Sequence, residues 1–177
     1  MAKDLFLLSF YLGGINLADL VRVDLSGPIL MYERKKTQLS KEGDKLIKLT
    51  IPDVAMPIIN KYKTKTGKLN FGYKFSYSNF QRYLNGKLKI LANEVGIKSQ
   101  FSYYSARKTF AQLAFDLGVK TEVIGYCIGQ SMKSNRPICN YVRVMQRQAD
   151  GAIAKVIDYT INPEKYADII YSEINKE

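Results

Sequence analysis

The chain has 177 residues, of which 46% are apolar, a formal net charge of +11 and no histidine. A chain of this length fits one domain whose core buries roughly 70% of the unfolded surface, so it needs no disulfides. The lack of histidine excludes most metal hydrolases and most serine or cysteine hydrolases, which use imidazole as a ligand or base. There is no run of about 18 apolar residues, so no membrane span is expected.

The cysteines, the first residues and the charge predict the compartment and the partner. Cys127 and Cys139 lie in apolar surroundings, which suggests free thiols in a reducing compartment. The first residues lack the cleavage pattern of a signal peptide, so we expect a cytoplasmic protein. The excess of lysine and arginine predicts a polyanionic partner, but charge alone does not separate DNA, RNA and membrane surfaces. Lysine-rich enzymes with no nucleic-acid role have the same composition.

The first half of the chain predicts short helices around a β-hairpin. Gly13 and Gly14 interrupt an apolar helical segment, and Asn16 can cap the short helix that follows. Two β-prone segments flank a basic connection that would form the tip of the hairpin. The expected elements are helices over residues 4–11, 16–21 and 52–62 and strands over residues 29–32 and 46–51.

The second half predicts only helices. Ser76 or Ser78 can cap a long helix, and glycines follow the expected ends of the first three helices. A start at Ser105 would place Arg107 in the first turn of its helix, where a cation is unfavourable to the helix dipole. The expected helices cover residues 76–95, 105–117, 121–128, 148–159 and 163–175. The predicted fold class is therefore mainly α with a small β-hairpin.

Three features could carry chemistry, and each has a simpler structural explanation. The basic run Arg34-Lys35-Lys36-Thr37 could present cations to phosphates, or it could be an ordinary solvated turn. The guanidinium of Arg107 could grip a phosphate through two hydrogen bonds, or it could be a surface or paired arginine. Tyr141 could act as a nucleophile, although any one of 13 tyrosines is more often a packing residue.

The order of these features resembles the catalytic domain of tyrosine recombinases, and within them the integrases of Bacteroides-type mobile elements. Residues 8–20 are similar to the first arginine motif of the family, and residues 34–37 look like the hairpin that carries its catalytic lysine. Tyr104-Ser105-Ala106-Arg107 resembles the second arginine motif, and residues 150–159 look like the helix that follows the nucleophile. The resemblance covers nearly the whole chain.

The resemblance implies a fold, a set of partners and a domain organisation. We expect the DNA breaking-rejoining fold in a single catalytic domain over residues 1–177, with a core over 1–160 and a C-terminal helix over 161–177 that protomers could exchange. The N-terminal DNA-binding domain that usually helps to clamp the duplex is expected to be absent from this chain. The implied partner is double-stranded DNA at an attachment site, with self-association as a tetramer on the DNA.

The resemblance also implies a role for individual residues. Tyr141 would attack a phosphodiester and form a 3′-phosphotyrosine bond, while Arg107 would stabilise charge on the non-bridging oxygens. Lys36 would donate a proton to the departing 5′-oxygen. Tyr104 and Gln130 stand where the family usually has histidine, or histidine or tryptophan, and no metal or cofactor is implied. The residues expected to bind DNA are Arg34, Lys35, Lys108, Arg136 and Arg143.

One departure from the family pattern bears directly on activity. The first arginine would fall at Asn16 or Gly13, and neither residue is charged. Losing one transition-state donor costs about 2.7–4 kcal/mol, so Arg22, Arg34 or Arg136 would have to reach the same oxygen.

Several alternatives therefore stay open. The chain could be a recombinase, a relative that binds DNA without cutting it, or a helical protein-interaction domain. A type IB topoisomerase shares the chemistry, but it usually keeps both arginines, the lysine and the histidine. Tyr126 and Tyr103 are the other candidates for the nucleophile, and Tyr126 lies in a short apolar helix that favours a place in the core.

Overall fold

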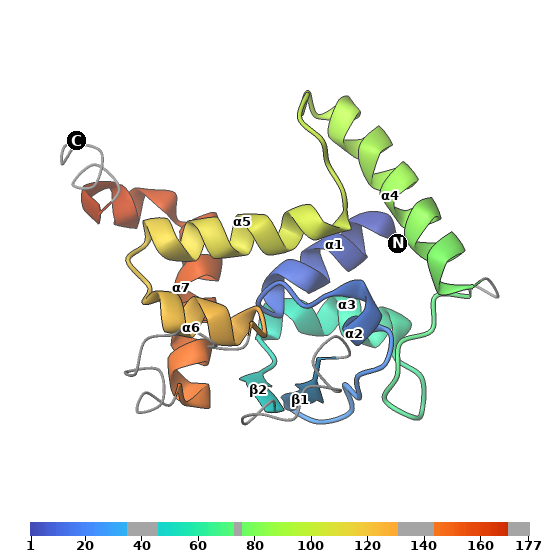
Figure 1. The fold of residues 1–177 in the computed structure, drawn as a ribbon, viewed down its shortest axis with the longest axis horizontal. Coiled ribbons are helices and arrows are strands. Elements are labelled where there is room, and N and C mark those ends of the chain that lie inside the picture. The colour runs from blue at the N-terminus through green and yellow to red at the C-terminus, as the bar shows by residue number, and fades with distance from the viewer. Residues whose placement is uncertain (35–45, 73–75, 131–143, 170–177) are drawn as a thin grey trace.

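A computed structural model describes residues 1–34, 46–72, 76–130 and 144–169. The described part of the chain is mainly helical, with one two-stranded antiparallel sheet, as the sequence predicts (Figure 1). In these ranges no helix is long and apolar enough to cross a bilayer. The elements are α1 (Ala2–Tyr11), α2 (Leu17–Leu20), β1 (Ile29–Glu33), β2 (Leu46–Thr50), the 3-10 helix η2 (Asp53–Ala55), α3 (Met56–Tyr62), α4 (Tyr77–Glu94), α5 (Tyr103–Asp116), α6 (Thr121–Cys127), α7 (Gln146–Ile161) and the 3-10 helix η4 (Pro163–Tyr166).

Helix α1 forms the centre of the core. It packs against α3, α4 and α5, and it runs beside the N-terminal half of α5 (Figure 1). Leu5 and Leu8 of α1 are fully buried, and the ring of Phe10 meets the buried ring of Phe110 edge to face at 6.2 Å. Burying each such side chain stabilises the fold by roughly 1.5–3 kcal/mol. The apolar character of residues 4–11 thus predicts this central helix correctly.

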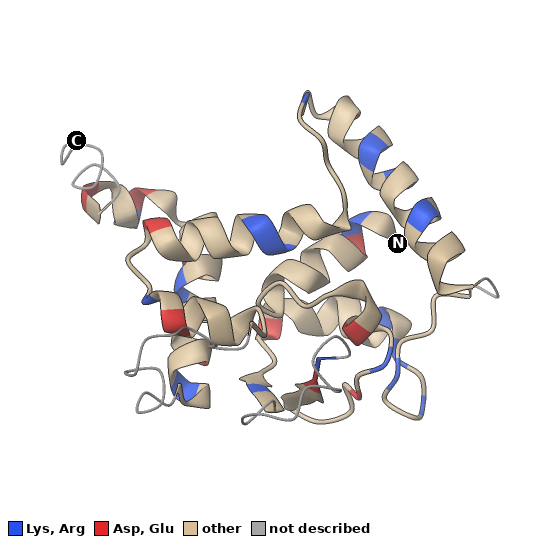
Figure 2. Ribbon diagram, viewed as in Figure 1, with Lys and Arg blue, Asp and Glu red and all other residues tan. Residues whose placement is uncertain are grey.

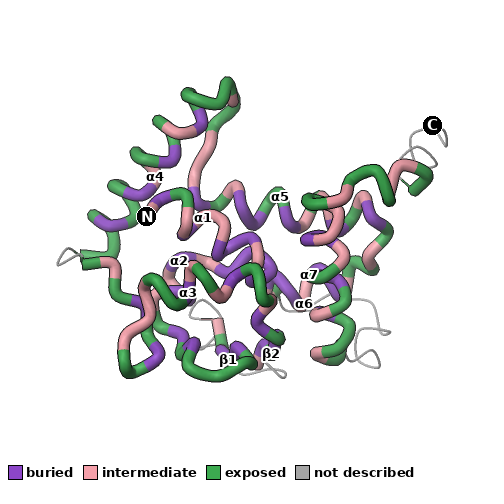
Figure 3. Tube along the Cα trace, turned by 180° about the vertical axis from the view of Figure 1, so that it is seen from behind, coloured by how far each residue is buried: buried purple, intermediate pink, exposed green. Residues whose placement is uncertain are grey.

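Helix α4 lies at the edge of the molecule and is buried along one side only. Its buried residues recur every fourth position, so they form a single stripe facing α1 and α5 (Figure 3). The hydroxyl of Ser76 accepts a hydrogen bond from the backbone N–H of Asn79 at 3.4 Å, which confirms Ser76 as the N-cap. The face of α4 opposite this buried stripe is exposed to solvent.

Helix α5 begins earlier than the sequence suggests. Ser102 is its N-cap, and the hydroxyl of Ser105 accepts a hydrogen bond from the Ser102 N–H at 3.1 Å. Ser105 therefore fills the place that glutamate or glutamine holds in a typical capping box. Because serine is also a favoured N-cap residue, the sequence alone suggests a helix start at Ser105. The expectation that Arg107 lies in the first turn is wrong, because Arg107 lies one turn further into the helix.

The hairpin has one buried face. Its register pairs Ile29 with Thr50 and Glu33 with Leu46. Buried and exposed residues alternate along β1, and β2 repeats this alternation from Ile47 to Thr50. The buried side chains join the core, and α7 packs against β2. The two predicted strands are confirmed to within one residue at each end.

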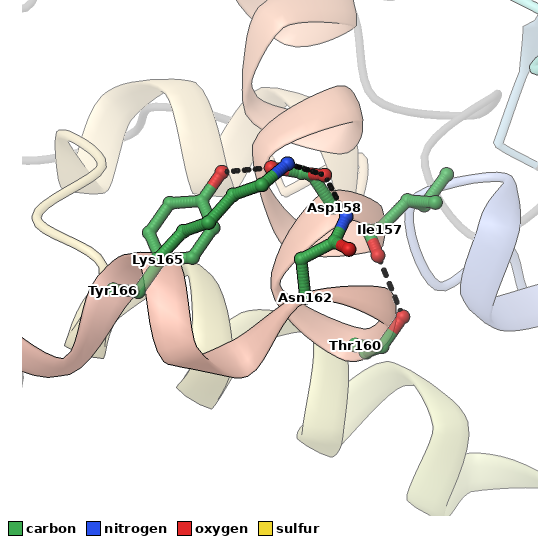
Figure 4. A network of polar contacts seen from close by, with 6 residues as sticks. All are labelled: Ile157, Asp158, Thr160, Asn162, Lys165 and Tyr166. Carbon is green, nitrogen blue, oxygen red and sulfur yellow. Dashed lines mark hydrogen bonds and ion pairs between the residues drawn. The ribbon is translucent and has the colours of Figure 1, made fainter.

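A polar network fixes the turn that follows α7 (Figure 4). The carboxylate of Asp158 accepts hydrogen bonds from Asn162 at 2.6 Å and Tyr166 at 2.7 Å, and Lys165 lies 3.3 Å away. The rings of Tyr159 and Tyr166 also meet edge to face at 5.8 Å. The helix expected over residues 163–175 begins as the 3-10 helix η4, and residues 170–175 lie outside the described ranges.

Candidate functional site

A hollow of about 500 Å³ brings distant segments together. It opens between α2, the first half of α4, the start of α5 and the end of β1, and its volume is in the range of small-ligand pockets. Four residues that the sequence singles out lie on its wall, namely Asn16, Arg34, Tyr104 and the alternative nucleophile Tyr103. The other lining residues are Leu17, Ala18, Asp19, Tyr77, Gln81, Asn85 and Ser102.

Arg107 lies beside this hollow as a buried cation. Only 5% of its surface is exposed, and its Nη1 donates a hydrogen bond to the carbonyl of Gly14 at 3.1 Å. Burial first, and then the positive charge of Arg34, lower the pKa of the Arg107 guanidinium below its ordinary value. No carboxylate forms an ion pair with Arg107 within the described ranges. Buried charges are normally paired, so this guanidinium is well placed to bind an anion.

The loop after α1 presents the Gly14 carbonyl to Arg107. The hydroxyls of Ser9 in α1 and Tyr103 in α5 both donate to the carbonyl of Ile15, at 2.8 and 3.0 Å, and so tie the loop to both helices. Gly14 has a φ of 77°, and a Cβ at this position would lie 2.9 Å from the Cα of Arg107. Only glycine fits here, because α5 approaches the loop this closely.

Arg34 is held in a similar way from the opposite side. It follows β1, and its Nη1 donates to the carbonyl of Gly129 at 2.6 Å. Gly129 ends α6 with a φ of 62°, and the aliphatic part of Arg34 packs directly against it. The backbone of Gln130, the next residue, donates to the carbonyl of Gly125 at 2.7 Å, and the Gln130 residue is exposed.

The structure separates the two candidate positions of the missing arginine. A side chain at Gly13 would point into the core, because its Cβ would lie 3.3 Å from the Cβ of Cys127. Asn16 instead lines the hollow. Arg34 lines the same hollow, whereas Arg22 is exposed and lines a different hollow of about 220 Å³. Of Arg22 and Arg34, the two candidates for compensation in the described ranges, Arg34 is the one at the site.

Tyr104 and Lys108 form an exposed rim beside Arg107. Tyr104 is half exposed, and the Nζ of Lys108 lies 5.8 Å from the centre of its ring. Tyr104 precedes Arg107 by about one helical turn, so both side chains lie on neighbouring parts of the α5 surface. Lys108 is exposed on α5, and its expected role as a phosphate contact stays a prediction.

The hydroxyls of the two alternative tyrosine nucleophiles are already engaged with the backbone. Tyr103 is buried, burial raises the pKa of its hydroxyl, and that hydroxyl donates to the carbonyl of Ile15. The hydroxyl of Tyr126 accepts a hydrogen bond from the Lys48 N–H at 2.9 Å and donates to the Lys48 carbonyl at 3.4 Å. Neither hydroxyl is placed to attack a phosphate.

Some of the expected site residues lie outside the described ranges. They include the expected nucleophile Tyr141 and the expected general acid Lys36, and also Lys35, Arg136 and Arg143. Of the two cysteines expected to be free thiols, one lies outside the described ranges and one lies within them. Cys139 lies outside, and Cys127 is a buried free cysteine whose pKa is raised to about 12 by burial.

Several residues of the hollow were not expected from the sequence. Tyr77, Gln81 and Asn85 recur every fourth position on α4, so their common face could have been found from the spacing. Asp19 gave no such signal. It is only 5% exposed and lines both hollows, and its charge, second to burial, raises the pKa of Tyr32.

No protein-family model matches the chain, and a search of curated proteins returns no significant match. Within the described ranges, no group of three or more histidine, cysteine, aspartate or glutamate side chains could hold a metal ion. The function is therefore inferred from the residues and their arrangement.

Proposed function

We propose that this chain is the catalytic domain of a site-specific tyrosine recombinase, with the DNA breaking-rejoining fold of that family. It would cleave and rejoin DNA strands through a 3′-phosphotyrosine intermediate. The observation that carries the proposal is that two guanidinium groups, Arg34 on the wall of the hollow and the buried Arg107, lie near enough for the charge of Arg34 to lower the pKa of Arg107. They come from segments far apart in the sequence, and each is oriented by a glycine carbonyl.

The proposed reaction needs no metal or external energy. The oxygen of Tyr141 attacks the phosphorus, and the bond from phosphorus to the 5′-oxygen breaks. Lys36 gives its proton to that leaving oxygen, which becomes a free 5′-hydroxyl. The new phosphotyrosine bond keeps the phosphodiester energy, so a 5′-hydroxyl can reverse the reaction on the same or another strand.

The two arginines supply the stabilisation of charge that this reaction requires. Guanidinium groups bind phosphate oxygens through paired hydrogen bonds and keep their charge when buried. Two cations close together repel each other, and the charge of Arg34 is the largest charge effect on the pKa of Arg107. A phosphate between them would relieve this repulsion. Arg34 would thereby take over the task of the arginine that the family places at Asn16.

The charge of the whole molecule fits DNA as the partner. Figure 2 shows basic residues along α4 and around the loop after α3, whereas acidic residues lie near the turn between α5 and α6, near the C-terminal end, and also on α1 and α2. A net charge of +11 favours binding to a polyanion. We propose double-stranded DNA at an attachment site as the substrate, self-association on that DNA, and a cytoplasmic location.

A DNA-binding relative that no longer cuts is the second candidate. It is favoured by the uncharged Asn16 and by Tyr104, a tyrosine where the family usually has an imidazole. In that case the two arginines would hold a backbone phosphate without any covalent step. A protein-interaction domain is a third reading, in which the arginines would have no part in DNA binding.

The arginine pair can be tested by trapping the covalent intermediate. The substrate is a pool of nicked duplexes with random sequence around the nick, in which the cleaved fragment diffuses away and leaves protein joined to DNA. Arg34→Ala and Arg107→Ala should each lower the rate of adduct formation by about 10²–10³-fold. Arg22→Ala is the matched control, because Arg22 is exposed and lines the other hollow, and its rate should stay near wild type. Equal rates in Arg34→Ala and Arg22→Ala would show that Arg34 does not replace the missing arginine.

A further inference from the structure

The outer edge of β2 is closed by side chains instead of a third strand. Lys48 and Thr50 direct their backbone N–H groups away from β1, and both groups are hydrogen-bonded to side chains of the second half of the molecule. The Lys48 N–H donates to the hydroxyl of Tyr126 in α6 at 2.9 Å, and the Thr50 N–H donates to Oδ1 of Asp150 in α7 at 2.7 Å. These pairs are 78 and 100 residues apart in the sequence.

Each contact has more than one hydrogen bond. The hydroxyl of Thr50 donates to Oδ2 of Asp150 at 2.6 Å, so Asp150 binds both polar groups of Thr50. Gln146, one turn earlier on α7, donates to the same hydroxyl at 3.0 Å. Tyr126 also donates to the Lys48 carbonyl, at 3.4 Å. We call these five residues the β2 edge junction: Lys48, Thr50, Tyr126, Gln146 and Asp150.

The main effect of the junction is to fix the position of β2 against α6 and α7, because it buries little surface. Lys48 and Thr50 are exposed, and Asp150 is only partly buried. Apolar packing between β2 and α7 is non-directional, so by itself it would let the strand slide along the helix. Hydrogen bonds that use both carboxylate oxygens have a narrow range of distance and angle. They therefore select one placement of β2 against α6 and α7.

We propose that the β2 edge junction positions the general acid relative to the nucleophile, with Asp150 as its central positioning residue. This proposal rests on the proposed function. In the sequence, Lys36 lies between β1 and β2, and Tyr141 lies between α6 and α7. Each expected reactive residue is thus carried by a connection between two elements, and the junction ties β2 to both helices that flank Tyr141. A shift of about 1 Å in such a constellation can lower a rate by about 10²-fold.

The test compares two leaving groups in single-turnover cleavage. One substrate is the ordinary nicked duplex, and the other carries a bridging 5′-sulfur, which leaves as a thiolate without needing a proton. Asp150→Ala should slow cleavage of the ordinary substrate by about 10–10²-fold, and the loss should be smaller on the sulfur substrate. Asp150→Asn, which keeps an acceptor for the Thr50 N–H, should recover part of the rate. Equal losses on both substrates would overturn the proposal.

Asp158→Ala is the matched control, because Asp158 is the other carboxylate of α7 and binds the turn after it. It should cleave both substrates like wild type. Exchange of backbone amide protons gives a readout that needs no activity: the Thr50 amide should exchange at least 10-fold faster in Asp150→Ala and at the wild-type rate in Asp158→Ala. Unchanged exchange in Asp150→Ala would also overturn the proposal. A wild-type chain that forms no adduct would remove the proposed function itself, whereas an active wild type with a fully active Asp150→Ala would remove only this inference.

Discussion

At the scale of single residues, the site depends on two glycines as much as on the arginines they orient. Gly14 and Gly129 adopt φ values of 77° and 62°, and their carbonyls accept hydrogen bonds from Arg107 and Arg34. The sequence predicts Gly14 as a helix break and Gly129 as a helix end. It does not show that each of them touches an arginine, because those contacts depend on how α5 and β1 approach.

Replacing Gly14 should separate the effect of backbone strain from that of helix propensity. Gly14→Ala should lower the free energy of unfolding by about 1–3 kcal/mol, because an alanine with positive φ is strained and its Cβ would meet Arg107. Gly86→Ala is the control, since Gly86 lies within α4 and a Cβ there would meet nothing within 4 Å. It should raise the free energy of unfolding by about 0.5–1 kcal/mol. Urea unfolding of both variants measures the difference, and a Gly14→Ala variant as stable as wild type would contradict this account of the loop.

At the scale of elements, capping residues decide which predictions succeed. Asn16 is at the N-cap position of α2, as expected, but its side chain makes no capping hydrogen bond, whereas Ser76 caps α4 through its hydroxyl. The start of α5 was missed because Ser102 and Ser105 are equally good caps by type. The β2 edge junction could not be predicted from local sequence at all, since Thr50 and Asp150 meet across 100 residues.

The turn after α7 should depend on pH through Asp158. Hydrogen bonds from Tyr166 and then from Asn162 hold the pKa of Asp158 below its ordinary value of 3.8. A carboxyl whose pKa is lowered by folding stabilises the fold above its unfolded pKa, and this contribution is lost as the pH falls through the folded pKa. The docking of η4 should therefore be constant at neutral and mildly acidic pH and weaken only below 3.8.

The ring protons of Tyr166 report this docking by NMR, because the Tyr159 ring lies edge to face with them at 5.8 Å. Asp158→Ala should remove the ring-current shift of Tyr166 at pH 7, while Asp168→Ala, an exposed carboxylate on the same segment, should leave it unchanged. A Tyr166 shift that survives Asp158→Ala at pH 7 would show that the aromatic contact alone holds the turn.

At the scale of the whole molecule, the composition and the helix pattern predict the fold class, and the hairpin is found where expected. What the sequence could not supply is which distant segments meet. The proximity of Arg34 to Arg107 requires that the end of β1, the loop after α1 and the end of α6 converge, and no local pattern encodes this. The resemblance to tyrosine recombinases supplies the expected order of motifs, and the place of Arg34 on the wall of the hollow is the basis for proposing it as the substitute for the missing first arginine.

The most direct test of the recombinase proposal is to identify the residue that becomes joined to DNA. The wild-type chain is incubated with the pool of nicked duplexes, digested with nuclease and protease, and analysed by mass spectrometry for a nucleotide-modified peptide. We predict a modification on Tyr141, and no adduct in Tyr141→Phe, while binding to unnicked DNA is the same in both chains. An absence of adduct from a wild-type chain that binds DNA, or an adduct that persists in Tyr141→Phe, would contradict the proposal.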